Sequence, residues 1–339
     1  LLIPVLNPLF SKCILIFSNI NNLCSTITVG VVAIPKVPII LWLIYFIILF
    51  MILKTKKRKY KIILPIVFLV ILLFPILDKA CHVYYLNVSQ GDSSLIVTPN
   101  KKAVLIDTGG LVSFKKEDWT VKTKKTNNAS NIKTFINSLG INELETLIIT
   151  HGDYDHMGEA VNLVNILKVK KVIFNCGEFN DLESSLIKVL EAKKIPYQSC
   201  IKELNIENYQ LNFLNTKAFG DENNNSNVIY TELNGYKFMF MGDAGIEKEK
   251  DILDKYNLAN IDVLKVGHHG SKTSSSKDFI DEIKPKYSII SVGKNNRYGH
   301  PNKEVLNNLS DSKIYRTDQD GSIMFKIKNN KLKIEICSQ

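Results

Sequence analysis

The feature that most constrains the fold is a crowd of ionisable side chains directly after an apolar run, in the segment LETLIITHGDYDH (144–156). His151, Asp153, Asp155 and His156 all lie within this short segment. Burying an unpaired charge costs several kcal/mol. Something at this point of the chain must therefore compensate for the crowding.

The other histidines are placed in a similar way. Five of the six histidines fall in three short segments after apolar runs, the other two segments being VGHHGS (His268, His269) and RYGHP (His300). Two more apolar runs end in Asp107 (VLIDTGG) and Asp243 (MFMGDAG). Imidazoles and carboxylates that converge from several strand ends form a metal site, because the cation compensates for their burial. A single residue of this kind would more often be a polar group in a turn, but the whole set predicts a metal centre.

Residues 78–339 have the pattern of one α/β domain. Helices are expected near 130–139, 158–168, 181–193, 247–256 and 302–309, and loops at 113–130 and 220–227. The early strands follow one another directly and the later ones alternate with helices, which predicts two mixed sheets with helices outside. The strand-like runs are VYYLNV, SLIVT, AVLID, LETLIIT, KVIF, QLNFLN, NVIYTEL, YKFMFMG, DVLKV, YSIISV, KIYRT and SIMFKI.

Residues 1–77 differ sharply from the rest, because they contain eight basic residues and no Asp or Glu. Two apolar runs, 37–53 and 62–77, predict a transmembrane hairpin, and residues 1–20 are a candidate third helix. The alternative is a pair of buried helices in a soluble protein. Trp42, Tyr45 and the basic loop 54–61 favour the membrane. The chain begins with Leu, so we expect this segment to end a longer channel domain.

The net charge of +10 is concentrated in that first segment, and residues 78–339 carry only about +2. The basic composition is therefore no argument for nucleic-acid binding. Because short cationic loops stay in the cytoplasm, we expect a multi-pass cell-membrane protein with residues 78–339 on the extracellular side. The six cysteines show no C-x-x-C pair and indicate neither a zinc ribbon nor a disulfide framework.

Four motifs in this order, VLIDTGG, THGDYDH, MGDAG and VGHHGS, resemble the metallo-β-lactamase fold, an αββα sandwich with metals at the strand ends. A narrower resemblance rests on LNVSQGDSSLIV (86–97), HGDYDH, LKVGHHGS and NNRYGHP after a membrane hairpin. This combination resembles the carboxy-terminal part of the ComEC family of competence proteins.

The resemblance implies a ligand set for one or two divalent ions, Mn²⁺ or Zn²⁺. His151 and Asp153 match the first site, Asp155 and His156 the second, Asp243 the bridging carboxylate, and His268 or His269 the last ligand. Asp153 replaces a histidine of the general pattern. The pattern has a further histidine ligand between this segment and the bridging Asp243, but residues 157–267 contain no histidine. Asn225 or Asn227 is expected in its place. Such an oxygen-rich site favours Mn²⁺.

Other residues receive supporting roles in this interpretation. We expect Asp155 and Asp243 to take part in catalysis, and Lys265, His300 or Asn296 to contact a phosphate or protonate a leaving oxygen. Asp92 and Asp107 are expected to orient turns or ligating histidines. The basic loop residues are either a DNA path or a solvated surface: Lys115, Lys116, Lys122, Lys124 and Lys125.

The resemblance also implies a function, which is degradation of one DNA strand outside the cell by a metal-dependent nuclease while the other strand is taken up. The expected partners are DNA, the membrane, the rest of the channel protein and the competence machinery, with no nucleotide cofactor. Two alternatives stay open. One is a surface hydrolase of another phosphodiester, and the other is a non-catalytic DNA-transport module.

Overall fold

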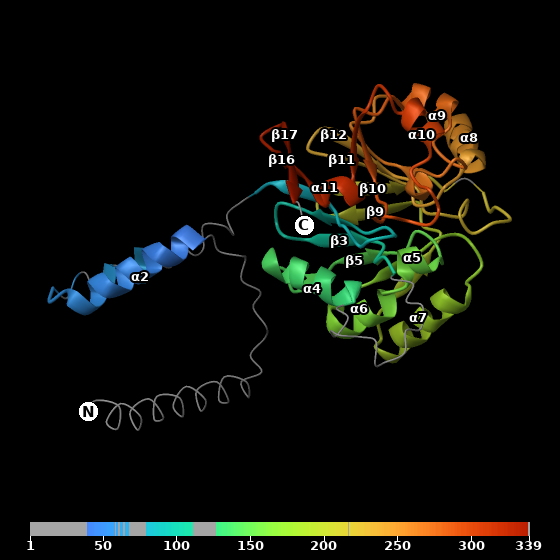
Figure 1. Ribbon diagram of the computed structural model, residues 1–339. Helices are drawn as coiled ribbons and strands as arrows, with labels where there is room; N and C mark the ends of the chain where they lie inside the picture. Colours follow the sequence, from blue (N-terminus) through green and yellow to red (C-terminus); the bar gives the residue numbers. More distant parts are fainter. Residues whose placement is uncertain are drawn as a thin grey trace. The chain divides into compact units, whose positions relative to one another are not determined.

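The structure is a computed structural model, and it describes residues 39–57, 59, 62–63, 65–67, 79–110, 127–215 and 217–337. Figure 1 shows two facing sheets between two layers of helices. The fold is thus the expected αββα sandwich. The lysines of the 113–130 loop and the candidate helix at 1–20 lie outside the described residues.

The first sheet has the order β17-β16-β1-β2-β3-β5-β7-β8. Its first four pairings are antiparallel, and the pairings from β3 to β8 are parallel. The strands are β1 (Cys81–Tyr85), β2 (Ser94–Val97), β3 (Ala103–Ile106), β5 (Thr146–Ile148), β7 (Val172–Phe174), β8 (Tyr197–Ser199), β16 (Ser322–Lys328) and β17 (Lys331–Cys337).

The second sheet has the order β15-β14-β13-β12-β11-β10-β9 and the same division into an antiparallel and a parallel part. A two-stranded sheet, β4 (Glu143–Leu144) with β6 (Lys168–Val169), lies apart from both. The second-sheet strands are β9 (Glu203–Ile206), β10 (Tyr209–Phe213), β11 (Ile229–Leu233), β12 (Tyr236–Phe240), β13 (Val263–Lys265), β14 (Tyr287–Ile290) and β15 (Lys313–Arg316).

The alternation of side chains along each strand divides the apolar core into three layers. On β12, Phe238 and Phe240 face the space between the sheets, whereas Met239 faces the helices outside. Val83 and Tyr84 of β1 divide in the same way. Successive strand residues point to opposite faces, so two buried faces require near-continuous apolar strands, as the sequence has.

The helices cover the outer faces of both sheets (Figure 1). Those on the first sheet present buried residues at helical spacing, for example Ile132 and Ile136 of α4. The first layer contains α4 (Asn128–Ser138), α6 (Ala160–Ile166) and α7 (Asp181–Ala192), and the second contains α8 (Ile246–Lys255), α9 (Lys277–Ile283) and α10 (Lys303–Asn308). Short helical turns are α5 (Tyr154–Met157), η3 (Gly267–Gly270) and α11 (Thr317–Asp320).

Every expected helix of the α/β domain is present, with ends shifted by a few residues, and α9 was not predicted. The strands β6, β8, β9 and β17 were also missed. The predicted end of the loop 113–130 was wrong, because helix α4 already begins at Asn128, after the N-cap residue Asn127. The expected loop 220–227 contains only turns and bends.

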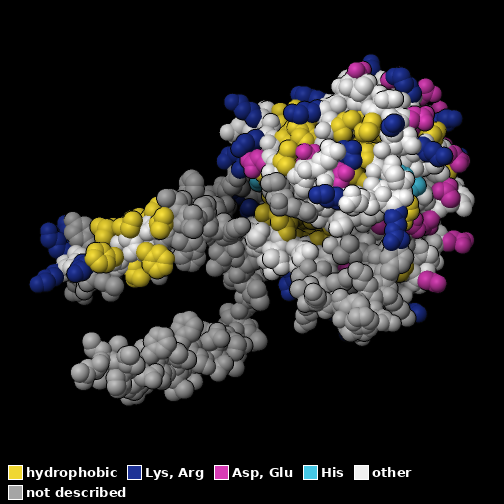
Figure 2. Space-filling view, viewed as in Figure 1, with side chains coloured by type: hydrophobic (Ala, Val, Ile, Leu, Met, Phe, Trp, Pro, Cys, Tyr) yellow, Lys and Arg dark blue, Asp and Glu magenta, His cyan; other side chains and the backbone are white. Residues whose placement is uncertain are grey.

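The predicted membrane segment is described only in part. Helix α2 (Ile39–Lys54) covers most of the first apolar run, and much of the second lies outside the described residues. Figure 2 shows hydrophobic side chains along this helix, where Phe46 is 60% and Phe50 61% exposed, and basic residues beyond it. None of the helices in the described ranges is both long and apolar enough to cross a membrane. The hairpin and the boundary at residue 77 stay predictions.

The cysteines correct one sequence inference. Cys176 and Cys200 form a disulfide, although no short spacing indicated one. The two residues lie just beyond the neighbouring parallel strands β7 and β8, whose pairing brings them together. Cys81 is a buried free thiol.

Candidate metal centre

The site lies beyond the carboxyl ends of parallel strands from both sheets. His151 and His156 follow β5, Asp243 follows β12, and His268 and His269 follow β13. The carboxyl ends of parallel strands meet at one edge of a sheet, so residues far apart in sequence converge there. This is the convergence expected from the sequence.

Asp243 lies at the centre of the cluster. One carboxylate oxygen is 3.0 Å from His156 Nε2 and 3.7 Å from His269 Nε2, and the other is 3.9 Å from His151 Nε2 and 3.7 Å from His268 Nε2. Asp155 joins from the other side, with Oδ2 3.1 Å from His269 Nε2. A single carboxylate therefore faces four imidazoles.

The polar atoms at the centre lack ordinary hydrogen-bond partners. Nε2 of His151, Nε2 of His156 and Oδ1 of Asp243 are buried and make no hydrogen bond of acceptable geometry. Such atoms are costly to bury unless something binds them. The donor set of imidazole nitrogen and carboxylate oxygen fits a divalent cation. His151, His156 and Asp243 form one compact group, and Asp155, His156 and His269 form a second.

The two neighbouring histidines of GHHG differ in position. Both have a left-handed backbone, with φ of 46° at His268 and 53° at His269, a conformation that is uncommon for a residue with a side chain. Backbone strain of this kind concentrates at functional sites. His269 is buried and belongs to the compact metal-binding groups, whereas His268 is partly exposed and its Nδ1 contacts Thr273 Oγ1 at 3.1 Å. His269 is therefore the better-placed ligand.

Asp107 orients His156 from behind. Its Oδ2 is 2.7 Å from His156 Nδ1, and its carboxylate also accepts hydrogen bonds from the backbone N–H and hydroxyl of Thr150 at 2.8 and 2.6 Å. Because Nδ1 of His156 is held in this way, Nε2 faces Asp243. The geometry agrees with the orienting role expected of Asp107.

Asp92 orients His269 by contacting its Nδ1, and Lys265 in turn holds the Asp92 carboxylate. The Asp92 carboxylate lies 3.3 Å from His269 Nδ1, which also contacts the Ser291 carbonyl at 2.9 Å. Lys265 Nζ donates to Asp92 at 2.6 Å and to the Val266 carbonyl at 3.1 Å. The Lys265 side chain is only 2% exposed. It is placed to position Asp92, not to contact a phosphate as expected.

The Asn-rich loop 220–227 is a structural part of the site. Ser226 Oγ accepts the backbone N–H of Asp243 at 3.1 Å, and Glu222 accepts that of Gly152 at 2.6 Å. Asn225 uses both ends of its amide on Phe219. Asn227 donates to the Ile149 carbonyl at 3.0 Å, and its Oδ1 is buried without a hydrogen-bond partner. Of the two asparagines, Asn227 has the free ligand atom.

Asp153 and His300 lie at the rim. Asp153 Oδ2 is 3.6 Å from His151 Nε2, and its side chain is 49% exposed. The His300 ring lies 6.0 Å from that of His268, and the His300 N–H donates to Asn296 Oδ1 at 3.0 Å. The Asn296 amide also donates to the His300 carbonyl at 2.7 Å. Asn296 therefore shapes this loop with its own side chain.

In the cluster, buried carboxylates are stabilised by the positive charge of neighbouring buried imidazoles. Burial opposes the ionisation of Asp243, but His156 and His269 outweigh it and hold the carboxyl pKa well below its usual range. Burial would lower the pKa of His269, yet Asp243 and Asp92 raise it to about 10. The negative charge therefore demands a positive partner, which is either a proton or a metal ion.

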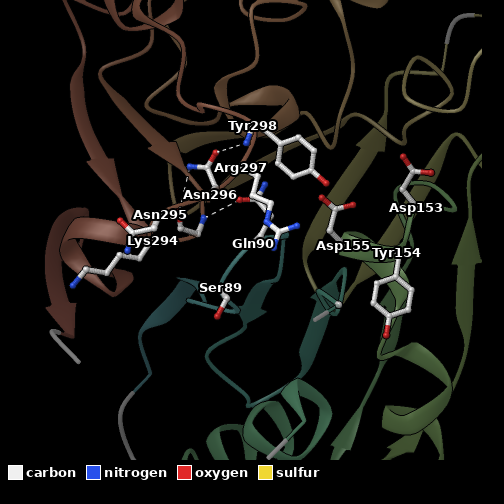
Figure 3. Close-up of a pocket in the computed structure, with 12 residues that line it drawn as sticks. Ser89, Gln90, Asp153, Tyr154, Asp155, Lys294, Asn295, Asn296, Arg297 and Tyr298 are labelled. Carbon is white, nitrogen blue, oxygen red and sulfur yellow. Dashed lines mark hydrogen bonds between the residues drawn. The ribbon is translucent and has the colours of Figure 1, made fainter. Parts of the chain in front are cut away.

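A cavity of about 490 Å³ opens beside the cluster. Figure 3 shows Asp153, Tyr154 and Asp155 on one side and the loop 294–298 with Gln90 on the other. Sequence reasoning singled out the motif NNRYGHP but gave no role to Arg297 or Tyr298. The available signal was a cation and an aromatic side by side, Arg297 and Tyr298, separated from the candidate catalytic His300 by one glycine.

Comparison with known proteins agrees with this architecture. Residues 86–294 match the model of the metallo-beta-lactamase superfamily, and the chain belongs to that superfamily. Membership and the buried His–Asp cluster together support a metal-dependent hydrolase.

The narrower resemblance to competence proteins is confirmed by the relatives. The chain is 34% identical to ComE operon protein 3 of Bacillus subtilis (strain 168), over 94% of this chain and 44% of that protein. It is 28% identical to Competence protein ComA of Neisseria gonorrhoeae, over 70% and 31%, and 29% identical to Recombination protein 2 of Haemophilus influenzae, over 78% and 31%. The chain spans less than half the length of each of these relatives.

Proposed function

We propose that this protein is a metal-dependent phosphodiesterase that cuts DNA, and that it serves DNA uptake by degrading the strand that is not transported. The observation that carries the proposal is Asp243, whose two oxygens face His151, His156, His268 and His269 at 3.0 to 3.9 Å. Its position suits a carboxylate shared between two cations.

The chain's own residues would hold the cation and orient its surroundings. His151, Asp153 and Asp243 would form one side of the site, and Asp155, His156 and His269 the other. A divalent cation bound there would polarise a phosphoryl oxygen and lower the pKa of a water molecule. His300 at the rim is half-buried, and burial together with the neighbouring His269 and His268 lowers its pKa. A neutral imidazole there could donate a hydrogen bond to a phosphate oxygen or accept a proton, but it would not supply the proton to a leaving oxygen.

The competence role and the substrate rest on the relatives. Two of the three have names that refer to competence or to its operon, and the third is named for recombination. DNA is the polymer common to these processes. A phosphodiesterase centre in such a protein therefore has DNA as its natural substrate.

The placement in the membrane with the catalytic domain outside is part of the same proposal. Helix α2 is apolar on all faces and exposes Phe46, Ile47 and Phe50, which suits a lipid environment. The disulfide Cys176–Cys200 suits an oxidising compartment, since cytosolic thiols are kept reduced. The helix supports placement in a membrane, and the disulfide supports an extracellular catalytic domain.

Cleavage of labelled DNA by the full chain in detergent micelles, with Mn²⁺ or Zn²⁺, tests the activity. We expect cleavage by the parent protein and none by Asp243→Asn, because the variant lacks the shared negative charge. Asp254→Asn, at an exposed position on α8, is the matched control and should keep full activity. An unchanged rate in Asp243→Asn would refute the site. Cleavage of a phosphocholine ester but not of DNA would support the alternative hydrolase.

A further inference from the structure

The cavity beside the metal centre has an aromatic and basic wall. Tyr298 is 69% exposed and Tyr154 is 40% exposed, and both line the cavity with Lys294 and Arg297. Large aromatic side chains are usually covered in a folded domain, and an exposed one at a cavity suggests a binding role. Asp153 and Asp155 line the same cavity, so whatever it holds lies next to the metal centre.

The loop that carries Tyr298 is held in place by hydrogen bonds, not by burial of the tyrosine. Asn296 Oδ1 accepts from the backbone N–H groups of Tyr298 at 3.2 Å and His300 at 3.0 Å. Asn296 Nδ2 donates to the carbonyl oxygen of His300 at 2.7 Å, and Gln90 accepts the N–H of Gly293 at 3.1 Å. Pre-organisation of this kind lowers the entropic cost of binding a ligand.

The rings of Tyr298 and Tyr154 lie next to residues of the candidate site. The Tyr298 ring stacks on the His300 ring at 5.8 Å with an interplanar angle of 13°, and His300 neighbours His268. On the opposite wall, a Cβ on Gly110 would lie 1.9 Å from the carbonyl oxygen of Tyr154 and 2.8 Å from its ring atom Cδ1. The glycine thus makes room for this tyrosine between two acidic residues of the site.

An exposed aromatic face beside cationic side chains binds one class of ligand well, an unpaired nucleobase with its phosphate. The base stacks on the ring and the phosphate contacts Lys or Arg. A base that is paired and stacked within a duplex cannot use such a ring. The composition of the cavity therefore favours single-stranded nucleic acid over duplex.

We propose that Tyr298, with Lys294 and Arg297, forms a subsite that stacks one unpaired nucleobase of the strand to be cut and places its phosphate at the metal centre. This inference rests on the proposed nuclease function and adds its substrate form. Stacking by an aromatic side chain is sequence-tolerant, so the subsite accepts any base.

The test is binding of a fluorescent single-stranded oligonucleotide to the full chain in detergent micelles with EDTA, which prevents cleavage. Tyr298→Ala should weaken binding by about tenfold, whereas Tyr298→Phe, which keeps the ring, should bind as the parent does. The same variants are measured with an oligonucleotide of abasic residues. There Tyr298→Ala should change nothing, because no base is present to stack.

The outcomes separate this proposal from the nuclease proposal. Equal losses with normal and abasic oligonucleotides, or no loss with either, would overturn the subsite. If the metal-loaded parent leaves DNA intact while the base-dependent loss is seen, the subsite holds and the nuclease function fails. If Tyr298→Ala cleaves DNA at the parental rate and binds it with the parental affinity, the nuclease proposal stands and the subsite proposal is overturned.

Discussion

The buried ion pair between Lys265 and Asp92 allows a sharp test of how the site is built. Its N–O distance is 2.6 Å, and the two side chains are 2% and 6% exposed. The surface pair Lys277–Asp281 has the same shortest distance, 2.6 Å, with side chains 67% and 56% exposed. The two pairs share their shortest distance and differ strongly in exposure, so a comparison of the two tests the effect of burial.

Removing one partner of the buried pair should be costly. Lys265→Met leaves the Asp92 charge buried without its cation, a change that costs about 3–5 kcal/mol of unfolding free energy. Burial alone would raise the pKa of Asp92, and Lys265 is the first of the charges that instead hold it low. The double variant Lys265→Met/Asp92→Asn has no uncompensated charge, so it should be more stable than the sum of the single changes by about 2–3 kcal/mol.

Urea unfolding of the full chain in EDTA, followed by circular dichroism, measures both cycles. The cycle Lys277→Met with Asp281→Asn should give a much smaller coupling, because solvent screens an exposed helical pair. If the buried coupling does not exceed the surface coupling by at least about 1 kcal/mol, burial does not govern this pair and our account of Lys265 is wrong.

Two further predictions concern the Asn-rich loop and a buried lysine of α8. Asn227→Ala should weaken metal binding by about tenfold in calorimetric titrations of the metal-free protein, while Asn225→Ala should not; equal effects would show that the loop acts only as a scaffold. Burial lowers the pKa of Lys248 from 10.5 to about 8, so the unfolded chain binds more protons between these values and stability rises with pH across that window. Lys248→Met should therefore stabilise the protein at pH 7 by up to about 3 kcal/mol and remove the slope, whereas Lys250→Met, on the exposed face, should change it by less than about 0.5 kcal/mol. A destabilised Lys248→Met in urea unfolding would contradict the assignment.

The sequence predicted those parts of the fold that depend on local pattern. Strands buried on both faces read as continuous apolar runs, and each ended in a polar motif, so the strand ends and the cluster around Asp243 could be anticipated. Helix α9 (Lys277–Ile283) was missed, although α10, which is no longer than α9, was predicted, and β17 was missed because its charged, alternating sequence suits one exposed face. These elements are set by packing against the rest of the sheet and the helices beside them.

What could not be predicted depends on distances in space. The disulfide Cys176–Cys200 follows from the parallel pairing of β7 with β8, which no spacing in the chain reveals. The sequence left Asn225 and Asn227 as equal candidates, whereas the hydrogen bonds of the two amides distinguish them: Asn225 uses both ends of its amide, and Asn227 Oδ1 has no hydrogen-bond partner. Lys265 was one of three candidates for a phosphate contact or proton donor, but its side chain is buried against Asp92.

The arrangement around the site explains why the charges can be so close together. Each buried imidazole that faces Asp243 is contacted at its other nitrogen: His151 by the Thr150 hydroxyl, His156 by Asp107, and His269 by Asp92 and the Ser291 carbonyl. These outer contacts set the direction of each Nε2 before any cation binds, so the loss of side-chain entropy on binding is small. Asp92 in turn depends on Lys265. The affinity of this centre for a metal ion would therefore depend on the strands and turns behind the ligands as much as on the ligands themselves.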